Sequence, residues 1–298
     1  MNTPASNAPT DDRWTVRRIL DWTTAHLKAK GSETPRLDAE ILLAHARDCN
    51  RVQLYTQYAE ELSGPQRARM RHLVNRRADR EPVAYLVGYR EFFSLDFKVT
   101  PDVLIPRPDT ETLLVELLQR ARGWDSPRVL DVGTGSGCIG VASAVNLPAA
   151  HVTATDVSES ALSVARENAQ THNVADRMTF LHGDLFEPIA EGSQFDFIVS
   201  NPPYVTEAEF AELQPEVNRH EPKHALVSGI DGLDAIRRLV AQAPRFLRPG
   251  GWLLFEIDSQ QAEVSGRLAR DAGAFDDVAP IQDLSRKFRV IVARIGPA

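Results

Sequence analysis

Hydrophobic residues recur every three to five positions through much of the first 85 residues, which is the spacing of amphipathic helices. This spacing predicts helices from about Trp14 to Leu27, from Pro35 to Arg47 and from Gly64 to Asp79. The residues before them, 1–12, are polar and are expected to form a loose tail. We therefore interpret residues 1–85 as a small helical domain.

The pattern changes to alternation after residue 85. Residues 91–99, with the sequence EFFSLDFKV, alternate as a half-buried strand does. The prolines of residues 104–108 end this strand, and Asp109 is predicted to cap a helix from Thr110 to Arg120. Residues 86–108 are interpreted as a β-containing connection between two domains.

From Arg128 onward, short apolar strands alternate with helical segments. The expected helices are Ser136–Asn146 and Ser160–Thr171, and the expected strands are Arg128–Asp131, His151–Asp156, Met178–Leu181, Phe195–Ser200, Trp252–Ile257 and Phe288–Ala293. This alternation predicts an α/β fold with a doubly wound, mostly parallel sheet that binds ligands at the carboxyl ends of its strands. Residues 109–298 are expected to form this second domain.

Composition narrows the class of protein. The chain has 298 residues, 43% of them hydrophobic and 25% charged, which is typical of a globular protein. Its net charge of −7 disfavours a general nucleic-acid binder. Neither a membrane-spanning run nor a signal peptide is recognisable. Because the two cysteines are far apart and the histidines lack metal-ligand spacing, we expect a cytoplasmic enzyme without a metal site.

A glycine-rich segment, Asp131-Val-Gly-Thr-Gly-Ser-Gly137, follows the first strand of the second domain. Its G-x-G-x-G spacing differs from the dinucleotide fingerprint G-x-G-x-x-G. An acid directly before the glycines suits the sulfonium and ammonium groups of S-adenosylmethionine better than a pyrophosphate. Asp156, which ends the next strand, is expected to accept both ribose hydroxyls. Asp184 and Leu185 follow the third strand and are expected to contact adenine. A simple strand-to-helix turn is the alternative interpretation, and three successive acids disfavour it.

The sequence Ser200-Asn-Pro-Pro-Tyr204 follows the next strand, and its two prolines stiffen the chain there. Such a loop suits methylation of a planar NH2 group, whose nitrogen lone pair is delocalised and weakly nucleophilic. The side-chain oxygen of Asn201 and the backbone carbonyl of Pro202 can each accept one N–H of this group. The nitrogen is then held in place and its pyramidalisation is favoured. Tyr204 can pack on the flat substrate group.

Together these motifs resemble those of the release factor glutamine methyltransferases, a family of class I methyltransferases. The resemblance covers nearly the whole chain and extends to residues 88–92, 104–111, 221–226 and 229–233. It implies an N-terminal helical domain, a β-hairpin linker and a Rossmann-like catalytic domain. It also implies methyl transfer from S-adenosylmethionine to the glutamine of the Gly-Gly-Gln motif in class I peptide-chain release factors, with neither a membrane nor a nucleic acid as partner.

The family motifs assign roles to individual residues of this chain. The implied cofactor contacts are Asp131, Gly133, Thr134, Gly135, Ser136, Gly137, Asp156, Asp184, Leu185 and Asn201. The implied substrate contacts are Asn201, Pro202, Pro203, Tyr204, Arg107 and Glu111, and the catalytic residues among them are Asn201, Pro202 and Tyr204. The segment from Arg107 to Glu111 is also compatible with a plain helix start. The chain departs from its relatives at Leu185, where they carry an aromatic residue, and at Asp258 and Arg286, where they usually carry glycine.

Other functions stay open at this point. Adenine-N6 methyltransferases of DNA or RNA share the NPPY loop, and the acidic net charge disfavours them. A related enzyme that methylates a glutamine of a large-subunit ribosomal protein fits nearly as well, although Pro108–Glu111 favours the release-factor branch. A non-catalytic binding module is disfavoured by the intact Asn201 and glycine loop.

Residues 67–80 contain six arginines and a single acid, Asp79. A solvated helix face is the usual explanation for such a charge run. The alternative hypothesis is that Arg69, Arg76 and Arg77 dock an acidic surface of the release factor.

Overall fold

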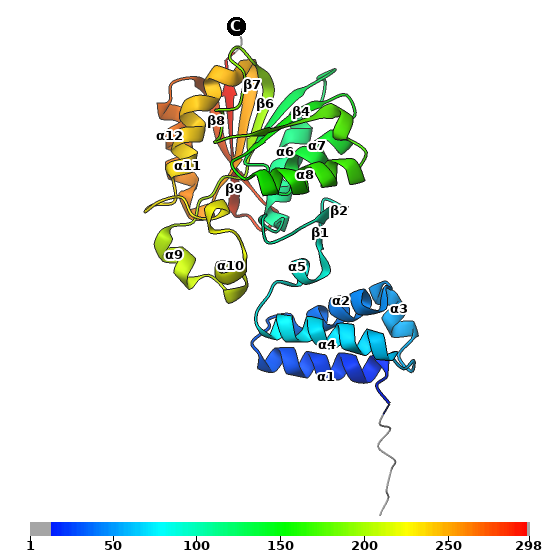
Figure 1. The fold of residues 1–298 in the computed structure, drawn as a ribbon. Coiled ribbons are helices and arrows are strands. Elements are labelled where there is room, and N and C mark those ends of the chain that lie inside the picture. Colours follow the sequence, from blue (N-terminus) through cyan, green and yellow to red (C-terminus); the bar gives the residue numbers. More distant parts are fainter. Residues whose placement is uncertain (1–12, 297–298) are drawn as a thin grey trace, which may run out of the picture. The chain divides into compact units, whose positions relative to one another are not determined.

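The computed structural model describes residues 13–296, and the predicted polar tail, residues 1–12, lies outside them. The chain divides into two compact units, the first ending at Val87 and the second beginning at Gly88 (Figure 1). Each unit has its own hydrophobic core and is described separately.

The first unit is helical. Its helices are α1 (Val16–Ala29), α2 (Pro35–Arg47), α3 (Arg51–Thr56), α4 (Gly64–Ala78) and α5 (Val83–Val87). The three helices predicted from periodicity are confirmed as α1, α2 and α4. The other two are less than two turns long, too short to show a hydrophobic period. Buried leucines from α1, α2 and α3, such as Leu20, Leu42 and Leu54, build the core.

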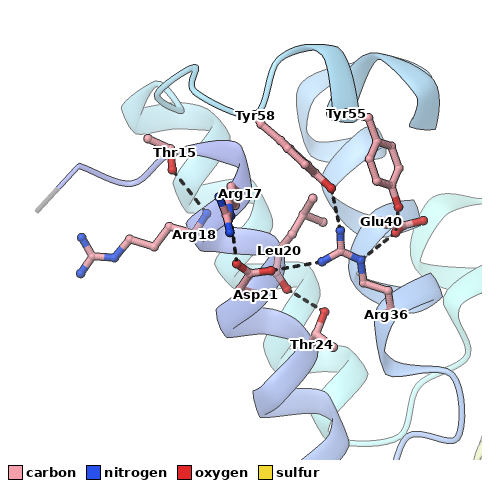
Figure 2. A network of polar contacts seen from close by, with 10 residues as sticks. All are labelled: Thr15, Arg17, Arg18, Leu20, Asp21, Thr24, Arg36, Glu40, Tyr55 and Tyr58. Carbon is pink, nitrogen blue, oxygen red and sulfur yellow. Dashed lines mark hydrogen bonds and ion pairs between the residues drawn. The ribbon is translucent and has the colours of Figure 1, made fainter. Parts of the chain in front are cut away.

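A polar network joins α1, α2 and α3 (Figure 2). The buried carboxylate of Glu40 accepts hydrogen bonds from Arg36 (2.8 Å), Arg51 (2.8 Å) and the hydroxyl of Tyr55. Arg36 also donates to Asp21 of α1 over 3.3 Å. Burial by itself would raise the pKa of Glu40, but the hydrogen bonds from Tyr55, Arg51 and Arg36 outweigh it and lower that pKa.

The arginines of α4 are used mostly within the unit. Arg77 is only 6% exposed and forms an ion pair of 2.7 Å with the buried Asp38. Arg69 and Arg76 also pair with acids of the same unit. The hypothesis of a docking surface made of these three arginines is therefore wrong for Arg77, because a buried ion pair faces no partner. The other two already have counter-ions.

The second unit is built on a seven-stranded sheet, and the doubly wound α/β fold is confirmed. The strand order is β5-β4-β3-β6-β7-β9-β8. The first five of these are parallel, whereas β9 runs antiparallel to β7 and β8 antiparallel to β9. The strands are β3 (Arg128–Val132), β4 (His151–Asp156), β5 (Met178–His182), β6 (Phe195–Ser200), β7 (Leu247–Glu256), β8 (Phe275–Gln282) and β9 (Phe288–Ile295). Strand β8 was not expected, because two acids and Pro280 interrupt its apolar pattern.

Helices cover both faces of this sheet (Figure 1). On one face lie α6 (Glu111–Arg120), α7 (Cys138–Asn146) and α8 (Glu159–Thr171), and on the other lie α11 (Asp234–Gln242) and α12 (Ala262–Asp271). Two short helices, α9 (Glu207–Glu212) and α10 (Pro215–His220), follow β6. Single 3-10 turns are η1 (Pro108–Thr110), η2 (Ala175–Arg177), η3 (Lys223–Ala225), η4 (Ala243–Phe246) and η5 (Ser259–Gln261).

Two details of the segment before the sheet differ from the sequence-based expectation. The strand predicted over 91–99 is a hairpin of β1 (Tyr89–Phe92) and β2 (Leu95–Lys98). It turns at Phe93 and Ser94, both with positive φ, as a tight two-residue turn requires.

The second difference concerns the start of α6. Asp109 was predicted to cap this helix, which is wrong because residues 108–110 form η1 without any side-chain cap. The carboxylate of Asp109 instead lies 2.9 Å from the guanidinium of Arg289 on β9.

Candidate active site

A cavity of about 470 Å³ lies at the carboxyl ends of the parallel strands. The strand order reverses there between β3 and β6, which is where open α/β sheets bind ligands. The predicted site residues that line it are Arg107, Gly133, Thr134, Gly135, Ser136, Asp156, Asp184, Leu185, Asn201 and Pro203. The others, Asp131, Gly137, Pro202, Tyr204 and Glu111, do not line the cavity. Its volume suits a small-molecule ligand.

The three glycines of the loop after β3 serve two purposes. Gly133 and Gly135 have φ of 71° and 56°, and an added Cβ at either would meet no protein atom within 4 Å. The backbone there is thus open toward the cavity, as a close ligand contact requires. At Gly137 a Cβ would lie 3.0 Å from that of Ala165, so this glycine lets α7 pack against α8.

Asp131 supports the glycine loop from beneath. It is fully buried, and its Oδ2 accepts hydrogen bonds from the hydroxyl of Thr134 (2.6 Å) and the backbone N–H of Gly140 (2.9 Å). Its Oδ1 has no hydrogen-bond partner among the described residues. Burial raises the pKa of Asp131 to about 6. The carboxylate therefore shapes the loop and adds negative charge below it.

Asp156 is held at the cavity by backbone contacts. Its Oδ2 accepts from the N–H of Gly135 (2.8 Å), and its Oδ1 accepts from the N–H of Ser158 (2.9 Å). Burial raises its pKa although these hydrogen bonds oppose the shift. A carboxylate oxygen can accept more than one hydrogen bond, so each oxygen can still receive a ligand hydroxyl.

Asp184 and Leu185 line the cavity beyond β5. The carboxylate of Asp184 forms a 2.7 Å ion pair with Arg238, a cavity residue on α11 that the sequence motifs did not indicate. Leu185 has a positive φ of 50°, and its carbonyl accepts a hydrogen bond from the hydroxyl of Thr155 (3.0 Å).

The NH2 group of the Asn201 side chain is hydrogen-bonded within the protein. Its Nδ2 donates to the hydroxyl oxygen of Thr110 over 3.2 Å, and both residues line the cavity. Its Oδ1 is left as the acceptor of this side chain. Thr110 had been expected only as a helix start, since nothing in the local sequence links it to a residue 91 positions away.

Tyr204 faces inward rather than toward the cavity. Its hydroxyl donates to Oε1 of Glu256 over 3.0 Å, and burial raises the pKa of Tyr204. Glu256 ends β7 and is 1% exposed. Burial raises the pKa of Glu256 to about 7, although the hydrogen bond from Tyr204 opposes this shift. Packing of Tyr204 on a substrate therefore stays a prediction.

Arg107 and Glu111 end up in different surroundings. Arg107 lines the cavity and donates to Oε1 of the buried Glu221 over 2.5 Å, while Oε2 accepts from the N–H of Ile105. Glu221 directly follows α10, so these contacts connect residues 105–107 to the end of that helix. Glu111 lies outside the cavity, where its carboxylate accepts a hydrogen bond from the N–H of Phe93 in the hairpin turn.

Two departures from the family pattern have a visible local geometry. Arg286 adopts a left-handed backbone with φ of 63°, the conformation for which glycine is preferred. Asp258 has an ordinary φ of −68°, and its side chain caps η5 by accepting from the N–H of Gln260. The first departure carries backbone strain, whereas the second supplies a cap.

Neither a nucleophile nor a metal centre stands out in this cavity. Burial raises the pKa of the Cys138 thiol to about 12, which keeps it protonated at neutral pH. Within residues 13–296, no cluster of three or more His, Cys, Asp or Glu is arranged to hold a metal ion. In the same part of the chain no helix is both long and apolar enough to span a membrane.

Comparison with known proteins places the chain in a family. Residues 18–88 match the PrmC N-terminal domain, and residues 108–219 match the Methyltransferase small domain. A release factor glutamine methyltransferase from Rhodopirellula baltica is 46% identical over 285 residues, which cover 94% of this chain and 96% of the relative. One from Geobacter sulfurreducens is 47% identical over 284 residues, with coverages of 95% and 98%.

Solved structures agree on the fold. A crystal structure of a methyltransferase from Pyrococcus furiosus is 19% identical, has a TM-score of 0.52, and matches over 69% of this chain and 91% of that chain. The predicted Rossmann-like methyltransferase fold is thus confirmed. With relatives above 40% identity over nearly its whole length, the chain belongs to the release factor glutamine methyltransferase family and is a methyltransferase.

Proposed function

We propose that this enzyme transfers the methyl group of S-adenosylmethionine to the side-chain amide of the glutamine in the Gly-Gly-Gln motif of class I peptide-chain release factors. The observation that carries this proposal is the state of Asn201. Its NH2 group donates to Thr110, so Oδ1 is its remaining acceptor at the cavity, where an incoming amide NH2 needs one. The names of the relatives support a release factor as the substrate.

The residues present fit S-adenosylmethionine. When bound, this molecule supplies an electrophilic methyl group on a positively charged sulfonium. Gly133 and Gly135 would contact it through backbone that no Cβ shields. Asp156 would accept the ribose hydroxyls, and Asp184 with Leu185 would lie at the adenine. The buried charge of Asp131 would favour a cation above the loop, because charge interactions strengthen in a medium of low dielectric.

Residues 201–204 would act on the amide. An amide nitrogen is a weak nucleophile because its lone pair is delocalised into the carbonyl. Asn201 Oδ1 and the backbone carbonyl of Pro202 would accept its two N–H groups and hold the nitrogen ready to pyramidalise. The nitrogen–methyl bond forms as the sulfur–methyl bond breaks, and one amide proton leaves to solvent. Catalysis then rests on orientation and electrostatics without a protein nucleophile.

The substrate is tested most directly by mass spectrometry. A purified release factor incubated with the enzyme and S-adenosylmethionine should gain one methyl group on the Gly-Gly-Gln peptide. A release factor whose motif glutamine is replaced by asparagine serves as the matched control. Methylation of a large-subunit ribosomal protein or of adenine in DNA or RNA, with no product on the release factor, would refute the proposed substrate.

Asn201→Ala tests the mechanism. This variant should cut methyl transfer by about a hundredfold or more while the affinity for S-adenosylmethionine stays near its original value, as expected on losing a contact made to the reacting group. Turnover and isothermal titration are the measurements. Turnover close to that of the unaltered enzyme would remove Asn201 from the mechanism.

We also propose that the first unit docks the protein substrate, as expected for residues 1–85. A groove of about 420 Å³ between α1 and α4 is lined by Trp14, Trp22, Arg67 and Arg71, among others. Trp22 is 50% exposed. Tryptophan and arginine are the residues most enriched at the energetic centres of protein interfaces.

Reversing two charges tests this docking surface. Arg67→Glu combined with Arg71→Glu should raise KM for the release factor and leave donor affinity unchanged. Lys28→Glu, on an exposed position of α1 outside the groove, is the control for a general charge effect. An unchanged KM in the double variant would contradict the assignment.

A further inference from the structure

Tyr204, the last residue of the NPPY loop, is held by hydrogen bonds at both its side chain and its backbone. Its hydroxyl donates to Oε1 of Glu256 over 3.0 Å. Its carbonyl oxygen accepts from Nε2 of Gln261 over 2.9 Å. Glu256 ends β7 and Gln261 ends η5, five residues later in the chain. Two side chains from one short segment therefore contact the same residue of the loop.

The surroundings of Tyr204 are closely packed. Gly232 has a φ of 72°, and an added Cβ there would lie 2.2 Å from the carbonyl oxygen of Tyr204. A side chain at that position would therefore displace the loop. The ring of Tyr204 packs against the core cluster that includes Phe255, and it does not line the cavity. The hydroxyl, the carbonyl and the ring of this residue are thus all in contact with the protein.

The other end of the loop is fixed as well. Ser200, which ends β6, donates from its hydroxyl to the carbonyl of Val132 over 2.8 Å. Asn201 and two prolines lie between Ser200 and Tyr204, and a proline ring fixes φ. In a stiff segment held at both ends, the directions of the Asn201 side chain and the Pro202 carbonyl depend on where Tyr204 is held.

We propose that Tyr204 anchors the NPPY loop and that Glu256 and Gln261 are positioning residues, which act through Tyr204 on the two acceptors of the substrate amide. The proposal rests on the proposed function, in which Asn201 Oδ1 and the Pro202 carbonyl accept the N–H groups of that amide. Methyl transfer requires the amide nitrogen to be aligned with the methyl group. A small displacement of either acceptor therefore lowers turnover more than it lowers binding.

Tyr204→Phe distinguishes an anchor from a ring that packs on the substrate, since it keeps the ring and removes the hydroxyl. A ring that only packs on the substrate would keep its turnover in this variant. We expect kcat to fall by about tenfold or more, with KM for the release factor and Kd for S-adenosylmethionine within about threefold of their original values. Tyr89→Phe makes the same change at an exposed tyrosine of β1 and is the control.

Variants of Glu256 test the partner of the hydroxyl. Glu256→Gln keeps an oxygen that can accept from Tyr204, so kcat should stay within about threefold of its original value. Glu256→Leu removes the acceptor and should lower kcat about as much as Tyr204→Phe does. The double variant Tyr204→Phe/Glu256→Leu should be no slower than the slower single variant, because both changes break the same contact.

Variants at the carbonyl of Tyr204 test the second contact. Gln261→Met removes the donor and should lower kcat by about threefold or more, and Gln260→Met makes the same change at the exposed neighbouring residue as a control. Gly232→Ala should lower kcat further, because the new Cβ would displace the carbonyl. Gly192→Ala controls for backbone strain, since Gly192 has a φ of 80° and a Cβ there would meet no atom within 4 Å.

The measurement separates positioning from stability. In each variant, the stoichiometry of S-adenosylmethionine binding gives the concentration of folded enzyme. Because kcat is then expressed per folded site, a loss of stability alone does not lower it. A fall in kcat in Tyr204→Phe that Glu256→Leu does not reproduce would refute the role of Glu256.

The outcomes also separate this inference from the proposed function. If Asn201→Ala loses turnover while Tyr204→Phe and Gln261→Met keep the original kcat, the anchor is refuted and the proposed function stands. Normal turnover in Asn201→Ala would refute both.

Discussion

One buried carboxylate of the first unit and two of the second have pKa values shifted in opposite directions. In the first unit, Glu40 is surrounded by two arginines and a tyrosine, and its pKa is lowered. In the second unit, Asp131 and Glu256 receive hydrogen bonds from hydroxyls and one backbone N–H, and their pKa values are raised to about 6 and about 7. Burial opposes ionisation at all three. At Glu40 hydrogen-bonded arginines help to outweigh it, whereas at Glu256 the charge of Arg289 lowers the pKa without overcoming burial.

This difference separates a structural use of charge from a functional one. Carboxylates neutralised by arginine join helices of the first unit and leave little charge for a partner. Asp131 and Glu256 of the second unit lie next to the loops at the cavity, and their pKa values are raised because burial dominates. Ionisable groups with raised pKa values at a cavity are typical of functional sites. On the proposed function, Asp131 serves a cationic methyl donor, and Glu256 holds Tyr204 at the end of the NPPY loop.

The largest expected effect comes from breaking a neutralised pair in the first unit. Arg77→Glu places a second carboxylate against the buried Asp38 and should destabilise that unit by about 3–5 kcal/mol, the usual cost of breaking a buried ion pair. Urea unfolding is the measurement. Arg69→Glu, in a pair exposed on both sides, should cost less than about 1 kcal/mol. Equal losses in the two variants would show that burial of the pair is unimportant.

Stability should respond to pH with opposite signs in the two units. Asp131 and Glu256 have raised pKa values when folded, so they bind protons more tightly in the folded state and their contribution falls as pH rises from about 4 to about 7. With about 1.4 kcal/mol per pKa unit, each loss is on the order of 3 kcal/mol. Glu40 has a lowered pKa, so its contribution is present above its ordinary value near 4.5 and is lost as pH falls through the lowered one.

Tryptophan fluorescence can follow each unit by itself. Two tryptophans lie in each unit, Trp14 and Trp22 in the first and Trp124 and Trp252 in the second. Replacing one pair by phenylalanine leaves a reporter for the other unit during urea unfolding at several pH values. Asp131→Asn and Glu256→Gln should flatten the response of the second unit. A response of the same sign in both units would contradict the comparison.

The smallest effect is expected from neutralising single carboxylates at pH 7. Glu40→Gln leaves Arg36 and Arg51 with one oxygen fewer to share and should cost about 1–2 kcal/mol. Asp131→Asn removes a buried charge whose ionisation costs stability and keeps one acceptor for Thr134, so the free energy of unfolding should stay the same or rise. The unfolding free energies of the two variants, measured under the same conditions, test this prediction. A larger loss of unfolding free energy in Asp131→Asn than in Glu40→Gln would contradict the proposed difference between these two carboxylates.

Local signals accounted for much of the fold, and ten of the fifteen predicted site residues line the cavity. The helix predicted over Pro35–Arg47 has the same bounds in the structure, because its apolar spacing and its first-turn proline act within a few residues. The glycine loop and Asp156 meet at the cavity because consecutive parallel strands end at one edge of the sheet. Strand β8 was not predicted from the sequence. Its acids and proline obscure the alternation of apolar and polar residues, although the segment still pairs with β9.

By itself, the sequence determined the class of fold, the loops that reach the cavity and the chemistry that their residue types allow. The tertiary structure alone decided that Tyr204 turns inward to Glu256 and that the amide of Asn201 is hydrogen-bonded to Thr110. The physical reason is the separation along the chain over which each kind of interaction acts. Turn and strand preferences act between neighbours in the chain, whereas these hydrogen bonds join side chains tens of residues apart, and they form only after the sheet has brought β6, β7 and η1 together.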